Sequence, residues 1–261
     1  MHRCGRKQTQ LLTIEVNYIH VQIKVGWTPD AIIGRHKHPN SCSMRTLYRM
    51  FARNRYGFSV RQLPMKGKAH PNGYEEHRGK AGLLGRSIYQ RYRDCPHYQD
   101  EFGHFEADTV QGKAHLGAVL TLVERQSKVM ILLNIHHKTD EAVNCQLDQW
   151  FAKLPRHFVK STTFDNGKEF AGSREIADKY DLHTCYAEVS APTQRGLHKN
   201  NNCLLRSDGI SKKLDFRDLP DELFTQLMHR RNNIPRKSLN YRTPLEVFLS
   251  HVTEEQLSPF F

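Results

Sequence analysis

The sequence predicts an α/β fold in which a mixed five-stranded sheet with flanking helices follows a small all-helical region. Apolar residues recur at helical spacing in residues 13–57, and β-rich runs with short breaks begin near residue 101. Charge divides the chain in the same way. Residues 1–100 hold 18 basic and 6 acidic side chains, a net charge of +12, whereas residues 101–261 hold 21 of each. This asymmetry predicts a front half that binds a polyanion, although a basic surface that only aids solubility is an alternative.

The front region reads as three short helices. The first is predicted over residues 13–25, and it ends at Gly26. Thr28 is a suitable N-cap for the second helix, and Pro29 fits its first position, where a missing N–H costs nothing. Ser43 can cap the third. The residues expected on the buried sides of the first and third helices are Ile14, Tyr18, Val21 and Val25, and Met44, Leu47, Tyr48 and Phe51.

The third helix also carries a stripe of cations. Arg45, Arg49 and Arg53 recur at i, i+4 and i+8 and therefore lie on one face. A short helical trio whose last helix shows such a stripe resembles a helix-turn-helix DNA-binding unit. Arginines at this spacing contact phosphates as readily as guanine edges, so no base contact is assigned. A small helical bundle with a solvated basic face remains the alternative.

The next segment differs in composition. Residues 58–100 are dense in Lys, Arg, Gly, Pro and His, with Lys66 and Lys68 among the cations, and show little apolar periodicity. They are predicted to form an extended basic linker along a phosphate backbone, with an unliganded flexible arm as the alternative. The expected organisation is a helix-turn-helix region, this linker, a catalytic core and a tail, over residues 1–57, 58–100, 101–253 and 254–261.

The second half alternates strands and helices. Three β-rich runs separated by short breaks predict an antiparallel meander. A helix over residues 139–153 then leads to a fourth strand, as in the crossover of an α/β unit. A fifth strand follows, and the remainder reads as helical. The five predicted strands cover residues 102–111, 115–124, 128–135, 159–164 and 182–187.

Two aspartates stand out within this pattern. Asp108 lies in the middle of the first predicted strand, where a charge is costly unless it faces a metal or a partner. Asp165 ends the fourth strand and precedes Asn166-Gly167, which can turn sharply. If these strands are adjacent, the two carboxylates meet at one sheet edge and offer hard oxygen ligands to Mg²⁺ or Mn²⁺, which suits phosphoryl transfer. A surface aspartate on an edge strand and an ordinary turn aspartate are the alternatives.

Five sequence blocks carry a family resemblance. The blocks GHFEADTV, TLVER, TFDNGKEF and QRG…NNN…LLR, with the closing RRNNIPRKSLNYRTPLEVF, resemble the transposases of insertion-sequence family thirty. The resemblance implies a ribonuclease-H-like core shared with retroviral integrases and an Asp-Asp-Glu, metal-dependent nuclease and strand transferase. Asp108 would be its first acid and Asp165 its second. Lys168 and Arg195, within the matching blocks, are further candidate DNA-binding residues.

The third acid is where the chain departs from the family. Lys199 occupies the position of the family glutamate, 34 residues after Asp165. An ammonium supplies no oxygen ligand and repels the cations that such a site binds. No carboxylate lies three, four or seven residues from Lys199. Glu106 shares a strand face with Asp108 but could at best supply an outer-shell contact. The sequence therefore predicts a weakened or inactive site.

The expected partners are double-stranded DNA, at the terminal inverted repeats of the element and at its target, and further copies of the chain. No apolar run approaches the ~20 residues of a membrane span, and the scattered cysteines favour reduced thiols in the bacterial cytoplasm, beside the nucleoid. Family members carry a further helix-turn-helix region ahead of Met1, so this start is expected to be a late one. The alternative function is a catalytically dead remnant that only occupies or titrates element ends.

Overall fold

The chain is described by a computed structural model and divides into two compact units. The helical unit comprises residues 1–72 and 234–243, and the core unit comprises residues 73–233 and 244–261. Within the parts that the structure describes, no helix is both long and apolar enough to cross a membrane. The structure describes residues 8–38, 41–64, 66, 85–115, 117–188 and 196–253, with only the backbone given for 115 and 196–200.

The helical unit contains the three helices that the sequence predicts. They are α1 (Thr13–Lys24), α2 (Pro29–Arg35) and α3 (Met44–Ala52). The side chain of Thr28 accepts a hydrogen bond from the Ala31 amide at 3.2 Å, and that of Ser43 accepts one from the Thr46 amide at 3.3 Å, which confirms both predicted caps. Two short 3₁₀ turns follow α3, and Phe58 after the first of them stacks on Phe51. These turns are η1 (Arg55–Gly57) and η2 (Val60–Gln62).

The predicted buried side of α1 is wrong for three of its four residues, while Tyr18 packs against the apolar cluster of the unit. Ile14, Val21 and Val25 are 67%, 55% and 45% exposed, whereas Ile19 and Ile23 are buried. The buried side also holds Glu15, whose carboxylate accepts hydrogen bonds from the backbone of Leu12 and from Ser41. A buried carboxylate that finds donors nearby is tolerated, so apolar periodicity alone selected the wrong face. In α3 the buried residues are Leu47, Met50 and Phe51, and Met44 and Tyr48 are each 39% exposed.

A C-terminal segment completes the helical unit. Residues 234–243, with the short turn η7 (Lys237–Leu239), pack on α2, although the sequence placed them in the core. Tyr241 donates its hydroxyl to Asp30 at 2.9 Å, and Arg35 donates to the Tyr241 carbonyl at 3.0 Å. Ile234 packs against the apolar cluster formed by the three helices. The helical unit is therefore built from two stretches that are distant in the sequence.

The core unit is organised around a five-stranded sheet. The strands are β1 (His104–Gln111), β2 (Ala118–Glu124), β3 (Met130–Asn134), β4 (Ser161–Phe164) and β5 (His183–Tyr186). They lie in the order β3-β2-β1-β4-β5. The first three form the predicted antiparallel meander, while β4 pairs in parallel with β1, and β5 in parallel with β4. This mixed sheet with flanking helices confirms the predicted fold class.

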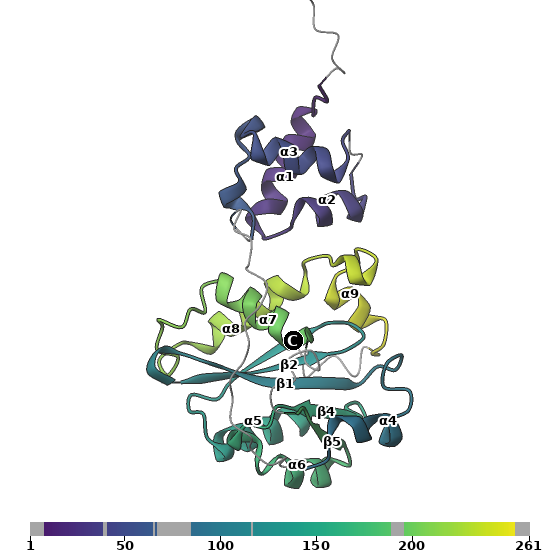
Figure 1. Ribbon diagram of the computed structural model, residues 1–261, viewed down its shortest axis with the longest axis vertical. Helices are drawn as coiled ribbons and strands as arrows, with labels where there is room; N and C mark the ends of the chain where they lie inside the picture. The colour runs from purple at the N-terminus through teal and green to yellow at the C-terminus, as the bar shows by residue number, and fades with distance from the viewer. Residues whose placement is uncertain are drawn as a thin grey trace, which may run out of the picture. The chain divides into compact units, whose positions relative to one another are not determined.

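Helices cover both faces of this sheet (Figure 1). The helices are α5 (Asp140–Phe151), α6 (Ser173–Tyr180), α7 (Gly196–Ser207), α8 (Asp221–Asn232) and α9 (Pro244–Leu249); the short turns are η4 (Lys113–His115) and η5 (Lys168–Phe170). On one face, Phe105 and Ala107 of β1 share an apolar cluster with Leu147 of α5 and Ala177 of α6. On the other face, Val110 joins residues of α7 and α8. Alternate residues of β1 thus enter different layers, which places Asp108 on the same side as α7.

The end of the predicted basic linker packs on the core rather than extending away from it. Residues 85–100 include η3 (Ile88–Gln90) and α4 (Arg91–Asp94), and Ser87 bridges to Tyr186 of the edge strand. Ile88, Arg91 and Tyr98 are each less than 5% exposed. Arg91 lies with its guanidinium 3.8 Å from the centre of the Tyr98 ring. These buried residues are scattered through a segment that is rich in basic residues and has little apolar periodicity, so the sequence pattern did not reveal them.

Replacement of Gly34 by alanine should destabilise the helical unit. An alanine inside a helix normally stabilises by about 0.5–1 kcal/mol relative to glycine, but a Cβ at Gly34 would lie 2.2 Å from the Tyr241 ring. We expect Gly34→Ala to cost about 1–3 kcal/mol, measured by hydrogen exchange of the α2 amides with the β2 amides as internal control. In a Tyr241→Ala background the same substitution should cost less, and an equal cost in both backgrounds would contradict the packing.

Stability should also depend on His104, at the start of β1. Burial is the main cause that lowers its pKa from the usual value of about 6.5, and its ring lies 2.7 Å from Ser161 Oγ. Between the lowered pKa of the folded chain and about 6.5, the folded chain keeps this imidazole neutral, whereas the unfolded chain protonates it. The contribution of His104 to the free energy of unfolding is therefore complete above pH ~6.5, and it is lost as the pH falls through the lowered pKa of the folded chain. Urea unfolding from pH 7.5 to about 5 should show a smaller loss of stability in His104→Gln; equal losses would contradict this.

Candidate active site

The pairing of β1 with β4 places the two predicted aspartates at the same level. In the parallel register, Glu106 lies opposite Thr163. Two residues further along each chain, Asp108 comes level with Asp165, which directly follows β4. Neighbouring strands lie about 4.8 Å apart, and residues paired in register point to the same face. The structure thus brings both residues to one edge of the sheet, as the sequence led us to expect.

The Asp108 carboxylate is held by donors from its own strand and from α7. The Thr109 amide donates to Oδ1 at 2.9 Å, and Asn202 Nδ2 of α7 donates to Oδ2 at 2.9 Å. The aspartate is half-buried. Both contacts favour the ionised carboxylate, because an ionised oxygen is the stronger acceptor. The side chain is therefore fixed in one orientation from the strand and from the helix.

Asp165 is fixed by the turn that follows it. Its side chain is buried, and Oδ1 accepts a hydrogen bond from the Gly167 amide at 3.0 Å. A Cβ at Gly167 would lie 2.8 Å from Asp165 Oδ1 and 2.4 Å from Glu169 Oε2. A larger residue at 167 would therefore displace one or both of these carboxylates. Lys168, a predicted DNA-binding residue, is exposed on this turn.

A third carboxylate at this edge was missed by the sequence reasoning. Glu169 is buried, and its Oε1 accepts from Thr109 Oγ1 at 2.9 Å and pairs with Lys138 Nζ at 2.8 Å. Thr109 points to the face opposite Asp108, so Glu169 approaches from the α5 side of the sheet. The TFDNGKEF block contains Glu169, and its acid four residues after Asp165 was the available signal.

Helix α7 crosses this edge and is firmly attached to it. Arg206 donates to the carbonyl oxygens of Gln111 at 2.7 Å and Ile210 at 3.1 Å. Arg231 of α8 donates to the Leu204 carbonyl at 3.1 Å and pairs with Asp208. The backbone at position 199 lies in the first turn of α7, while the Lys199 side chain lies outside the described residues. Arg195 and Lys68 also lie outside them.

Glu106 is engaged elsewhere. Its side chain is 1% exposed, and Oε1 accepts from Arg125 Nη1 at 2.6 Å. The guanidinium of Arg125 also lies 4.5 Å from the centre of the Tyr98 ring. Arg91 packs on the same ring, and burial lowers the pKa of this guanidinium. Glu106 therefore joins the GHFEADTV block to the arginine of TLVER by an ion pair through Oε1, while its Oε2 is buried and has no hydrogen-bond partner among the described residues.

The donor set at this edge is suited to a hard divalent cation. Asp108 and Asp165 offer carboxylate oxygens, which Mg²⁺ and Mn²⁺ prefer. The buried amide oxygen of Asn202, beside Asp108, has no hydrogen-bond partner among the described residues. Across the described parts of the chain, no three His, Cys, Asp or Glu side chains gather closely enough to hold a metal ion. The oxygens offered to an ion at this edge are thus those of Asp108, Asp165 and Asn202, while Glu169 is engaged by Thr109 and Lys138.

The predicted cationic stripe is present on the helical unit. Arg45 and Arg49 on α3, and Arg53 at its C-cap, are exposed, as is Lys66. Within the described part of this unit only Glu15 and Asp30 are acidic, and both accept hydrogen bonds from the unit itself. Among the contacts of the described residues, neither acid forms an ion pair with an arginine of the stripe. The arginines are therefore available to an external polyanion.

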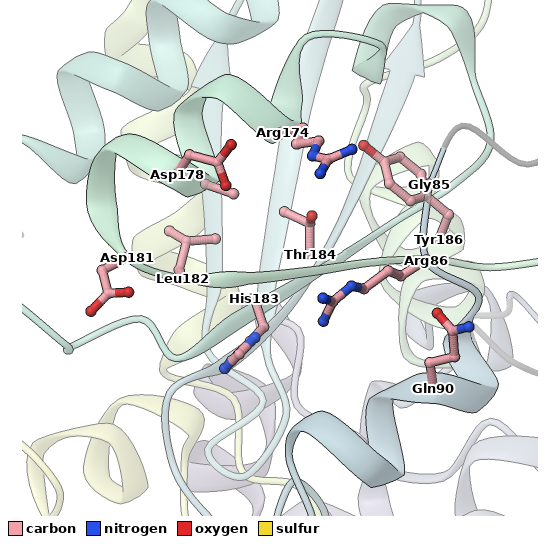
Figure 2. Close-up of a pocket in the computed structure, with 11 residues that line it drawn as sticks. Gly85, Arg86, Gln90, Arg174, Asp178, Asp181, Leu182, His183, Thr184 and Tyr186 are labelled. Carbon is pink, nitrogen blue, oxygen red and sulfur yellow. The ribbon is translucent and has the colours of Figure 1, made fainter.

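A separate pocket lies along the edge strand β5 (Figure 2). It has a volume of about 560 Å³, and the side chains of Arg86 and Arg174 point into it on either side of Thr184. Asp178 and Asp181 line its other end. Neither Asp108 nor Asp165 contributes to its lining. The pocket is therefore distinct from the edge that carries the predicted aspartates.

Comparisons with known proteins give several relatives. The transposase for insertion sequence element IS4351 of Bacteroides fragilis is 28% identical over 240 residues, covering 90% of this chain and 73% of that protein. The transposase InsI for insertion sequence element IS30A of Escherichia coli is 27% identical over 240 residues, covering 87% of this chain and 62% of that protein. The putative integrase ORF3 of Spiroplasma virus SpV1-R8A2 B is 26% identical over 255 residues, covering 95% of this chain and 77% of that protein.

The chain was also compared with protein-family models and with solved structures. No protein-family model matches the chain. Among solved structures, a chain of the simian T-cell lymphotropic virus intasome in complex with PP2A regulatory subunit B56 gamma is similar, with a TM-score of 0.45 and 15% identity over 58% of this chain and 55% of that one. The alignments with the sequence relatives extend over most of this chain. They confirm its resemblance to the transposases of insertion-sequence family thirty.

Proposed function

We propose that this chain is an insertion-sequence transposase whose helical unit binds DNA and whose core carries a metal-dependent site for DNA cleavage and strand transfer. The observation that carries the proposal is the level placement of Asp108 and Asp165 on adjacent parallel strands beneath α7. The relatives support it, since they are transposases and an integrase. The substrates would be the terminal inverted repeats of an element and its target DNA, bound by more than one copy of the chain in the cytoplasm.

Asp108 and Asp165 would hold Mg²⁺ or Mn²⁺. When bound, such an ion supplies a Lewis acid that polarises a phosphoryl oxygen and lowers the pKa of a water molecule. The residues of the chain hold both carboxylates in fixed orientations. Thr109 and Asn202 donate to Asp108, and the Gly167 amide donates to Asp165. Lys138 neutralises Glu169, which limits the repulsion between Glu169 and Asp165.

Lys199 would weaken this site. With three acids the site would carry a formal charge of −3, whereas two acids and an ammonium give −1. One charge–charge interaction at ~4 Å is worth about 4 kcal/mol at an effective dielectric constant of 20, which corresponds to orders of magnitude in ion affinity. Moving the ammonium into solvent would remove the repulsion without restoring the missing ligand. We therefore propose that cleavage by this copy is impaired.

A DNA-binding protein without catalysis is the second candidate. The described residues of the helical unit hold twelve Lys and Arg, nine in residues 8–66 and three in residues 234–243, against two acids. Such a unit can hold DNA whatever happens at Lys199, because phosphate binding requires only cations. A chain of this kind would occupy element ends or compete with active copies. The two candidates differ in cleavage and agree in binding.

Removal of the α3 arginines should weaken DNA binding. Changing Arg45, Arg49 and Arg53 together to alanine should lower the affinity of the full chain for duplex DNA. The salt slope should decrease by about 0.9 for each phosphate that is no longer neutralised. The control changes three exposed cations of the core to alanine and should have little effect; these are Lys153, Arg156 and Arg174. Fluorescence anisotropy at several salt concentrations measures both. Equal losses in the two triple variants would contradict binding through α3.

Restoration of the third acid should restore cleavage. The assay uses supercoiled plasmid that carries the gene with its flanking DNA, in Mg²⁺ and at high protein concentration. We expect no nicking by the wild type and measurable nicking by Lys199→Glu, because the substitution adds a ligand and removes a repulsion. Lys199→Gln, which removes only the charge, should recover less. Addition of Asp108→Ala to Lys199→Glu should abolish nicking, and robust Mg²⁺-dependent cleavage by the wild type that Asp108→Ala abolishes would overturn the assignment of Lys199.

A further inference from the structure

One side chain joins α7 to the first aspartate of the site. Asn202 Nδ2 donates to Asp108 Oδ2 at 2.9 Å. An ionised carboxylate only accepts hydrogen bonds, so the amide must present its nitrogen to Asp108. The amide oxygen then faces away from that carboxylate oxygen while remaining next to it. This oxygen is buried and has no hydrogen-bond partner among the described residues.

An unpartnered buried amide oxygen is costly. Loss of its hydrogen bond to water without replacement costs about 1–3 kcal/mol. Such an atom calls for a physical reason, one of which is coordination of an ion. An amide oxygen is a hard, neutral donor of the kind that divalent cations accept beside carboxylates. Its position beside Asp108 is therefore the position of a potential ligand.

The location of Asn202 on α7 strengthens this interpretation. It lies three residues after Lys199, so the two positions share one face of the helix. Its neighbour Leu205 is buried in the apolar cluster beneath α7, and Arg206 attaches the same turn to β1. The amide is thus held by a packed helix and cannot leave the edge without disrupting that packing. Position 199 and Asn202 approach the same sheet edge from one side.

We propose that Asn202 is a positioning residue for Asp108 and supplies a neutral oxygen ligand to the divalent cation at this edge, partly replacing the carboxylate missing at Lys199. The inference rests on the proposed metal site. Beyond that site, the inference assigns one oxygen ligand, the amide of Asn202, to helix α7. The alternative role is purely structural, with Asn202 serving only to dock α7 on β1.

Metal binding to the full chain separates these roles without any cleavage assay. Titration of Mn²⁺, followed by electron paramagnetic resonance of the free ion, compares the wild type with Asn202→Ala and Asn202→Asp. We expect Asn202→Ala to bind at least tenfold more weakly, in the range found for partners that orient a ligand. Asn202→Asp should bind at least tenfold more tightly, because it adds a carboxylate. Cys203→Asp adds the same charge at an exposed neighbouring position and should change the affinity less than threefold.

Thermal unfolding supplies a second readout. Without metal, Asn202→Asp should melt below the wild type, because the introduced carboxylate would face that of Asp108. Mn²⁺ should raise its melting temperature more than that of the wild type or of Cys203→Asp. A structural role alone gives no such metal-dependent reversal, and a shift that is equal in the three proteins would overturn the inference. This comparison also shows whether each variant is folded.

The outcomes distinguish this inference from the proposed function. If Asp108→Ala abolishes Mn²⁺ binding and Asn202→Ala leaves it unchanged, the inference is wrong and the metal site stands. If the wild type binds no Mn²⁺ and Lys199→Glu does, Asn202 supplies no useful ligand and the inference also fails. If Asp108→Ala leaves binding unchanged in both the wild type and Lys199→Glu, the metal site itself is wrong.

Discussion

The parallel pairing of β1 with β4 is the constraint on which the candidate site depends. It brings Asp108 level with Asp165, although 56 residues, among them the helix α5, lie between the two aspartates in the sequence. Successive side chains of β1 point to opposite faces of the sheet, and they therefore enter the two helical layers in turn. Ala107 joins the α5 face, and Asp108 turns toward α7. A shift of the register by one residue would move the aspartate into the apolar layer, where its charge would lack these donors.

The family blocks have mutually supporting structural roles around that pairing. Glu106 and Arg125, from two different blocks, form a buried ion pair on adjacent strands. Removing Arg125 would leave the Glu106 carboxylate buried and unpaired, which costs about 3–5 kcal/mol. Gly167 allows the turn after β4 to hold Asp165, and Arg206 fixes α7 to β1. These contacts do not involve the side chain at position 199, so the core can persist with lysine there.

The sequence predicted the layout of the core well because the strands are β-rich runs and the short breaks between the first three force turns. It also located Asp108, since a charge within an apolar run is conspicuous. It failed where burial depends on distant partners. Glu15 receives hydrogen bonds from Ser41, 26 residues further along the chain, and Tyr241 reaches the helical unit from the far end of the chain. No local pattern reports such contacts, and the same holds for Asn202 and its approach to Asp108.

The central claim is that Asp108 and Asp165 together bind a divalent cation. Anomalous diffraction from crystals of the Lys199→Glu chain grown with Mn²⁺ tests it most directly, because the signal locates the ion independently of activity. The account predicts a peak within about 2.0–2.6 Å of oxygens from both aspartates. Carboxylates separated by more than about 8 Å, beyond the reach of a shared pair of ions, or a Mn²⁺ peak that contacts neither aspartate, would contradict it.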